Sequence, residues 1–203
     1  MGVSISVAIA GAGIYGATTA IYLAKKGYKV TLFDPLGIMN ASSSINQYRI
    51  HSGYHYPRSP ETIAEILTAR DEFIQEYADA VVEARQHLYA MPHSGSRVSS
   101  EFFINAMSKF GLPLNEVRPK WMDFNFINIC WKVEEYLYDP YLLKQIIKRR
   151  LERYGVNFFA KRLEFSEAQK RWDFVVWATY GLYPKIKAET PLQLHVAEKI
   201  LFR

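Results

Sequence analysis

The sequence is poor in cysteine, since Cys130 is the only one among 203 residues. An internal disulfide is therefore excluded, and a lone thiol is compatible with a reducing compartment. Long apolar runs are also absent, and none approaches the roughly 18 to 20 residues that a membrane-spanning helix needs. The first ten residues lack the basic region that opens a secretory signal. We therefore expect a cytoplasmic protein without a membrane span.

The excess of one charge is modest, because 25 Lys and Arg residues stand against 20 Asp and Glu residues. The densest basic run, residues 144–153, has Leu and Ile at helical intervals, so its charges belong mostly to the solvent side of a helix. No zinc-ligand pattern, recognition helix or aromatic RNA-binding motif accompanies it. We expect no nucleic-acid partner, and an anionic cofactor and a small-molecule substrate account better for the basic balance.

Glycine is concentrated near the amino terminus, where GAGIYG follows a short apolar run and has the spacing G-x-G-x-x-G. The apolar run has no charge, as in a strand that is buried on both faces. The pattern predicts a strand, a glycine turn, a helix and a second strand at residues 5–10, 11–16, 17–26 and 29–33.

Each glycine has a physical reason in a dinucleotide site. Gly11 allows the tight turn, Gly13 lets a pyrophosphate approach the backbone, and Gly16 lets helix and strand pack closely. The backbone N–H groups of Ile14 and Tyr15, at the helix N-terminus, then face the phosphates. The alternative is a glycine-rich turn that binds nothing.

Asp34 ends the second predicted strand, roughly 20 residues after the glycines, as the motif requires. Its carboxylate can accept hydrogen bonds from an adenosine ribose, and it disfavours the 2′-phosphate of NADP. The string GAGIYGATTAIYLAKKGYKVTLFD resembles the amino-terminal signature of FAD-dependent oxidoreductases of the D-amino-acid oxidase superfamily. Glycine and sarcosine oxidases, glycerol-3-phosphate dehydrogenases and 2-hydroxyglutarate oxidases belong to that superfamily. The resemblance implies FAD as the cofactor.

Residues 35–60 form a long polar and aromatic segment, and loops of this length are usually functional. A plain surface loop with turns is one alternative. A metal site at His51 and His55 is another, but Gly53 between them argues against the helix that such a pair needs. The string ASSSINQYRIHSGYHY resembles the stretch that passes the cofactor in the superfamily. The resemblance implies phosphate contacts for Ser43 and Ser44, a position near the flavin ring for Arg49, and flavin or substrate contacts for His51 and Tyr54.

The remaining pattern predicts helices and strands in alternation. Helices are expected at residues 59–79, 100–110 and 139–155, strands at 86–91 and 156–159, and an antiparallel sheet within 115–138. The string WDFVVWATYG, residues 172–181, predicts a buried strand and a turn. It resembles a second superfamily signature, which implies that Ala178, Thr179 and Gly181 approach the dinucleotide.

Together these elements predict an α/β protein with a Rossmann-like FAD-binding domain and an inserted antiparallel β-rich substrate domain. The first would comprise residues 1–80 and 139–190, and the second residues 81–138 and 191–203. The resemblance covers only about the first half of the superfamily's architecture. We therefore expect a chain that is truncated at its C-terminus, with self-association or a missing C-terminal half.

The function that the resemblance implies is hydride transfer to a flavin from a C–H bond next to an amine or a hydroxyl. Substrates would be small amines, amino acids or 2-hydroxy acids, and Arg49 would pair with an anionic flavin or a substrate carboxylate. Two alternatives stay open. One is a non-catalytic dinucleotide-binding remnant, and the other is an NAD-dependent dehydrogenase, against which the lack of a second βαβ repeat after residue 60 weighs.

Overall fold

The computed structural model describes residues 4–84 and 86–180. Contacts divide the described chain into two units: residues up to Asn46 with those from Lys144 onward, and Gln47–Leu143. The predicted division differs, because it assigned residues 47–80 to the FAD-binding part. As an assignment of function, the predicted division stays a prediction.

The first unit is built on a parallel four-stranded sheet in the order β10-β1-β2-β9. In β1, residues 7–10 are at most 3% exposed, because a strand with neighbours on both edges and cover on both faces takes only apolar side chains. This confirms the predicted parallel sheet. The strands are β1 (Ser6–Ala10), β2 (Lys29–Phe33), β9 (Asn157–Phe159) and β10 (Phe174–Trp177).

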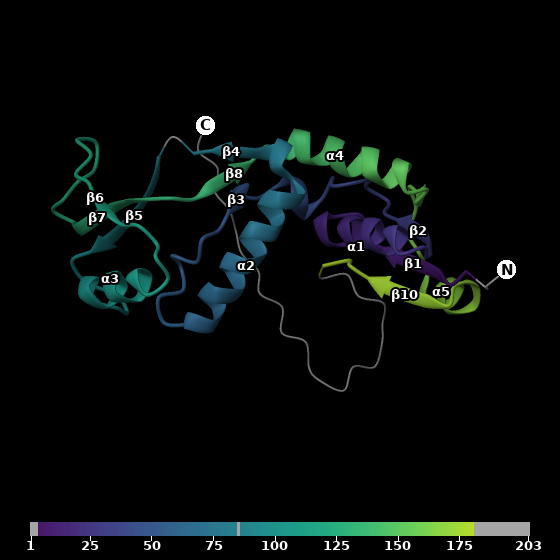
Figure 1. Cartoon of the computed structure of the whole chain (residues 1–203), viewed down its shortest axis with the longest axis horizontal. Coiled ribbons are helices and arrows are strands. Elements are labelled where there is room, and N and C mark those ends of the chain that lie inside the picture. The colour runs from purple at the N-terminus through teal and green to yellow at the C-terminus, as the bar shows by residue number, and fades with distance from the viewer. Residues whose placement is uncertain (1–3, 85, 181–203) are drawn as a thin grey trace. The chain divides into compact units, whose positions relative to one another are not determined.

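Helices connect these strands in the first unit. Helix α1 (Ile14–Lys25) joins β1 to β2 and packs against both (Figure 1). Helix α5 (Phe165–Arg171) joins β9 to β10 within the short interval that the sequence leaves between these strands. Ala168 of α5 is buried in a cluster with Ala8, Phe33 and Leu163, so the short connection covers one part of the sheet.

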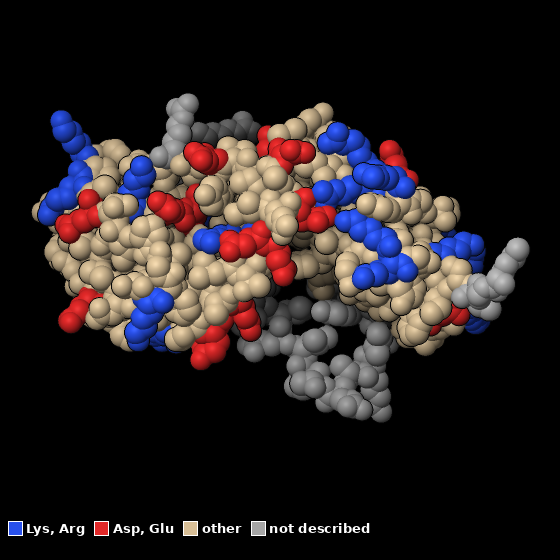
Figure 2. Space-filling model, in the orientation of Figure 1, with Lys and Arg blue, Asp and Glu red and all other residues tan. Residues whose placement is uncertain are grey.

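Helix α4 (Pro140–Arg153) is amphipathic, as its sequence predicts. Leu143, Ile146, Ile147 and Leu151 are buried, whereas Leu142 is 43% exposed. Lysine and arginine side chains gather over the region of this helix in the space-filling view (Figure 2). The basic run therefore covers the outer side of a packed helix.

The second unit contains two antiparallel sheets of three strands, ordered β3-β8-β4 and β5-β7-β6. Residues 115–138 supply three of the strands, which confirms the antiparallel prediction. The bounds are β3 (Arg49–Ile50), β4 (Val81–Glu83), β5 (His87–Pro92), β6 (Asn115–Glu116), β7 (Ile127–Val133) and β8 (Tyr136–Tyr138).

The helices of the second unit are α2 (Pro60–Glu76) and α3 (Ser100–Ser108). Each unit also has a short 3₁₀ turn, at Ser42–Ser44 in the first and at Ala78–Ala80 in the second. Ser99 caps α3, since its Oγ accepts a hydrogen bond from the Phe102 N–H at 3.1 Å. Ser59 is the N-cap residue of α2, but its hydroxyl bonds to that of Thr62, 2.8 Å away, and makes no hydrogen bond to a backbone N–H of the helix. No helix in the described ranges combines the length and the apolar character needed to cross a bilayer.

The chain passes from one sheet of this unit to the other at Glu134 and Glu135. Strand β7 ends at Val133 and β8 begins at Tyr136, so the two acids occupy the crossing point. Beside it lies a core in which Tyr54, Ile63, Phe103, Met107 and Trp131 are each at most 5% exposed. A polar side chain that turns inward at this crossing is therefore withdrawn from water.

Candidate functional site

The glycine turn of the first unit joins β1 to α1 and lies against the residues that follow β10. Gly11 has φ +96°, and a Cβ there would lie 2.7 Å from the carbonyl carbon of Ala178. The position therefore admits only glycine, for reasons of backbone conformation and of space. Ala178 in turn donates its N–H to the carbonyl of Ala10 at 2.8 Å. The two sequence signatures therefore meet in the folded chain.

Gly13 leaves bare backbone at the N-terminus of α1. Its φ of −67° suits any residue, so backbone conformation does not require glycine here, and the reason for glycine is the space that a side chain would occupy. A Cβ would come within 3.0 Å of the Ser43 Oγ. The first turn of α1 carries no acidic residue, so nothing of negative charge within it opposes an anion at this helix end. These residues fit the pyrophosphate of a dinucleotide.

Ser43 and Ser44 lie differently with respect to this helix end. The Ser43 Oγ accepts the N–H of Ile14 at 2.9 Å, which brings the predicted serine to the predicted helix N-terminus. The Ser44 hydroxyl donates instead to the carbonyl of Ala41 at 2.8 Å. Tyr15 follows Ile14 and is 83% exposed. Phosphate contacts of these residues stay predictions.

Asp34 holds the glycine turn in place. Its Oδ2 accepts the N–H of Ala12 and its Oδ1 accepts that of Leu36, each at 2.8 Å. A carboxylate oxygen has a second lone pair, so each oxygen can still accept a ribose hydroxyl. The predicted ribose contact is compatible with this geometry, and the structure adds a role in shaping the loop. Of the second signature, Thr179 follows Ala178, whereas Gly181 lies outside the described residues.

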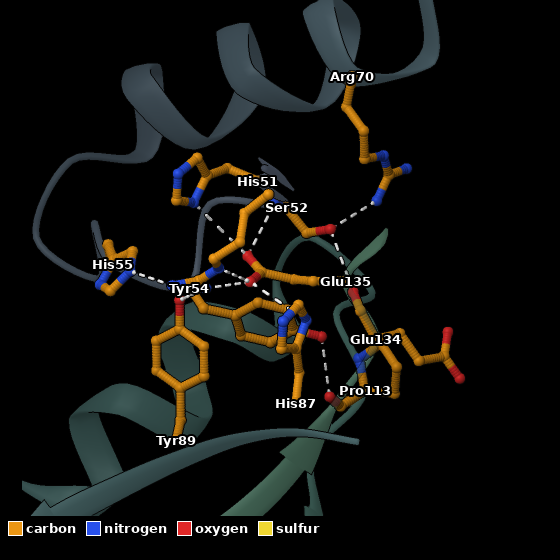
Figure 3. A network of polar contacts seen from close by, with 11 residues as sticks. His51, Ser52, Tyr54, His55, Arg70, His87, Tyr89, Pro113, Glu134 and Glu135 are labelled. Atoms are coloured by element: carbon orange, nitrogen blue, oxygen red, sulfur yellow. Dashed lines mark hydrogen bonds and ion pairs between the residues drawn. The ribbon is translucent and has the colours of Figure 1, made fainter. Parts of the chain in front are cut away.

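The second unit contains a network of polar side chains around Glu135, whose side chain is fully buried (Figure 3). Its Oε1 accepts the Ser52 N–H at 3.0 Å and lies 3.9 Å from His51 Nδ1. Its Oε2 accepts hydrogen bonds from Arg49 and lies 3.8 Å from His87 Nδ1. The pairing of β3 with β8 explains why these side chains are close together. Ile50 lies opposite Tyr136 in this antiparallel pair, so the next residues along the two segments, His51 and Glu135, are also neighbours.

Arg49 is the cationic partner of Glu135 in this network. Its Nε lies 3.1 Å from Glu135 Oε2, and its other nitrogens bond to Tyr89 Oη at 2.7 Å and His55 Nε2 at 3.1 Å. Burial by itself lowers the pKa of Arg49, but the hydrogen bonds with Glu135 and Tyr89 outweigh it and the pKa is raised. The guanidinium is charged, and that charge is already balanced. The predicted pairing with a flavin or a substrate carboxylate stays a prediction.

The environment of His51, His55 and Tyr89 favours their uncharged forms. Burial lowers the pKa of His51 and of His55, and the positive charge of Arg49 lowers both further. Burial raises the pKa of Tyr89 to about 12, and the negative charge of Glu135 adds to the effect. These three side chains therefore surround the ion pair of Arg49 and Glu135 as neutral polar groups.

Tyr54 occupies a core position. The residue is 1% exposed, and its hydroxyl donates to the carbonyl of Pro113 at 3.0 Å. Burial raises its pKa to about 12. The predicted contact of Tyr54 with flavin or substrate stays a prediction. His51 differs, since 43% of its side chain is exposed.

The alternative of a metal site gains no support from the geometry. The rings of His51 and His55 have centroids 5.6 Å apart and are inclined at 61°. Within residues 4–84 and 86–180, no group of three or more His, Cys, Asp and Glu side chains is placed to hold a metal ion.

Comparison with known families agrees with the fold and the glycine turn. The profile of the family described as "DAO: FAD dependent oxidoreductase" matches residues 6–176. The chain belongs to this family. The predicted family, the flavoprotein class and its cofactor, FAD, are thereby confirmed at the level of the family.

Sequence relatives include two fungal flavoproteins. The FAD-dependent monooxygenase FPY4 of Fusarium mangiferae is 28% identical over 186 residues, which are 88% of this chain and 50% of that protein. The FAD-dependent monooxygenase kojA of Aspergillus flavus is 34% identical over 103 residues, 48% of this chain and 24% of that protein. The chain thus spans about half the length of the Fusarium relative.

Solved structures share the fold at low sequence identity. The L-alpha-glycerophosphate oxidase of Mycoplasma pneumoniae, solved with FAD bound, has a TM-score of 0.60 at 18% identity. It is matched over 78% of this chain and 45% of that chain. Glycine oxidase of Geobacillus kaustophilus has a TM-score of 0.58 at 15% identity, over 77% and 47% of the two chains.

Sequence reasoning missed Glu135, Tyr89 and His87, which complete the network around Arg49. A signal was present for one of them. Two adjacent acids, Glu134 and Glu135, interrupt an otherwise apolar and aromatic strand region. An acid in such a place needs a cationic partner, because an unpaired buried charge is very costly. Nothing local indicated which cation that was.

Proposed function

We propose that this chain forms part of an FAD-dependent oxidoreductase that oxidises a small amine, amino acid or 2-hydroxy acid. The single observation that carries the proposal is the bare backbone at Gly13 beside the α1 N-terminus, in a chain of this family. The pyrophosphate would be held at the N–H groups that begin α1, with the Ser43 hydroxyl beside it and the ribose at Asp34. When bound, FAD supplies the ring that accepts hydride from the substrate.

The proposal assigns the dinucleotide to the first unit and the small-molecule substrate to the second. The network around Glu135 supports the second assignment, because a partly exposed imidazole and Arg49 lie next to a buried carboxylate. Arg70 joins the same network through the Ser52 hydroxyl. Such groups can orient a polar substrate and exchange a proton with it. We also propose a cytoplasmic location, and self-association or a missing C-terminal half.

An NAD-dependent dehydrogenase is less well supported. The strands from β3 to β8 pair in antiparallel fashion, whereas a nicotinamide half adds a second parallel βαβ unit. A non-catalytic nucleotide-binding protein is the other alternative. It would share the glycine turn and would bind ADP as well as it binds FAD.

One experiment separates these possibilities. The purified chain is incubated with FAD, ADP or NAD⁺, and thermal unfolding is followed before and after gel filtration, with flavin absorbance as a second readout. We expect FAD to remain bound and to raise the unfolding temperature more than ADP does. Stabilisation by ADP alone would favour the nucleotide-binding protein, and stabilisation by NAD⁺ alone would overturn the flavoprotein assignment.

A monooxygenase is a second candidate activity, favoured by the names of the fungal relatives. Oxidases and monooxygenases differ in the origin of the product oxygen. With ¹⁸O₂ and a substrate found by anaerobic flavin reduction, a dehydrogenation leaves no label in the product, and a monooxygenation inserts one labelled atom.

A further inference from the structure

A cleft of about 230 Å³ lies in the second unit between one face of α2 and strands β3 and β8. Ile66, Ala69, Arg70 and Phe73 line it from α2, at the spacing that places residues on one side of a helix. Arg49, His51 and Tyr138 line it from the strand side. The cleft therefore has a polar end with two arginines and an apolar wall.

Arg70 is held at the cleft by a partner inside the unit. Its Nη1 donates to the Ser52 hydroxyl at 3.2 Å, and Ser52 in turn donates to the Glu134 carbonyl at 3.1 Å (Figure 3). The Arg70 side chain is 22% exposed. A lysine or arginine that only solubilised the helix would extend into water, so the bond to Ser52 indicates a fixed orientation.

The charge of Arg70 is weakly compensated, in contrast to that of Arg49. Arg49 is balanced by the buried Glu135, whereas Arg70 pairs at 2.9 Å with Asp71, whose side chain is 67% exposed. An ion pair with so exposed a carboxylate is worth little. A guanidinium has five N–H donors, and the bonds to Asp71 and Ser52 use three of the five on Arg70. No acidic side chain is among the residues that line the cleft.

We propose that this cleft binds a small monocarboxylate with an apolar body. Arg70 binds the carboxylate through its remaining N–H groups, because arginine is suited to paired hydrogen bonds with a carboxylate. Ile66, Phe73 and Tyr138 contact the apolar body; the rings of Phe73 and Tyr138 have centroids 5.8 Å apart. The identification of this carboxylate as the enzyme's substrate rests on the proposed function.

The size of the cleft limits the ligand. Its volume of about 230 Å³ is small beside the roughly 300 to 1,000 Å³ of ordinary ligand pockets. A ligand of similar bulk is a short branched carboxylic acid.

The test measures binding of 3-methylbutanoate to the full chain by ligand-observed NMR and by titration, without added FAD. The uncharged probe is 3-methylbutanamide, and the small anionic probe is acetate. The variants are Arg70→Gln, which removes the charge and keeps most of the stem, and Phe73→Ala, which shortens the apolar wall. Arg58→Gln, an exposed arginine of the same unit that does not line the cleft, is the matched control.

We expect 3-methylbutanoate to bind the unaltered chain and Arg58→Gln equally, and Arg70→Gln at least tenfold more weakly. The amide should bind at least tenfold more weakly than the acid. Phe73→Ala should weaken 3-methylbutanoate and leave acetate unchanged. Equal binding of acid and amide, equal binding to Arg70→Gln and Arg58→Gln, or no binding at millimolar concentrations would overturn the proposal. Flavin retention is measured separately, so a failure of FAD binding is distinguishable from a failure here.

Discussion

Gly16 lies directly against the carbonyl group of Gly11, and a Cβ on Gly16 would come within 3.0 Å of that carbonyl carbon and closer still to its oxygen. Both partners are backbone, which cannot turn aside. At Gly13, by contrast, a Cβ would meet only the Ser43 hydroxyl oxygen at 3.0 Å, the end of a side chain that can rotate. The glycines of one motif therefore serve different purposes.

This contrast separates folding from binding. We expect Gly16→Ala to destabilise the fold by about 1 to 3 kcal/mol or more, because the added methyl group forces the turn apart. Gly13→Val should retain a near-normal unfolding temperature and lose FAD, because its side chain fills the approach to the helix end. Circular dichroism melting and flavin retention after gel filtration measure the two effects. A folded Gly13→Val protein that keeps FAD would show that the pyrophosphate lies elsewhere.

Glu135 and Arg49 should depend on each other for stability. Glu135→Ala leaves the guanidinium in a part-buried place without its anion, which typically costs about 3 to 5 kcal/mol. Replacing both residues by leucine should recover much of that loss, since no unpaired charge remains. Urea unfolding of the single and double variants measures this. If Glu135→Ala costs no more than a surface substitution, water reaches the pair and the network is not a buried one.

Asp34 should affect both the loop and the ligand. Asp34→Ala removes the acceptor of the Ala12 and Leu36 N–H groups, so we expect a lower unfolding temperature without any ligand. Adenine-nucleotide binding should weaken by about 1 to 3 kcal/mol through the lost ribose bond.

Titration with ADP and with 2′-deoxy-ADP separates the two effects. The part of the loss that arises from the ribose bond should be absent for the deoxy ligand. An identical loss for both ligands would mean that Asp34 acts only by shaping the glycine turn.

Asp173 should contribute stability that disappears in acid. Its Oδ2 accepts the Ser6 N–H and the Ser6 hydroxyl, each at 2.7 Å, and these bonds lower the pKa of the carboxyl. A pKa lowered by folding contributes stability that is fully present above the unfolded value, about 4. That contribution is lost as the pH falls through the lower folded value.

We therefore expect Asp173→Ala to melt below the wild type at neutral pH and to approach it at strongly acid pH. Ser6→Ala keeps the backbone donor, so it should show the same pH dependence with a smaller amplitude. Thermal melts across a pH series test this, and a difference that persists unchanged into strong acid would contradict it.

The amino-acid sequence by itself determined the first unit well. Residues 5 to 34 specify a strand, a glycine turn and a helix through local spacing, and the structure has β1, α1 and β2 there. The family followed from the same residues, and the antiparallel sheet followed from the aromatic and β-branched residues within 115–138; both predictions are confirmed. Local patterns suffice here because each element is specified by residues close together in the chain.

Tertiary structure alone decided the second unit's polar centre. Arg49 and Glu135 are 86 positions apart, and only the pairing of β3 with β8 brings them together. It also placed Tyr54 in the core and turned Arg70 toward Ser52. The physical reason is that the burial and charge partner of a side chain are set by strand pairing between distant segments. No periodicity within either segment records that pairing.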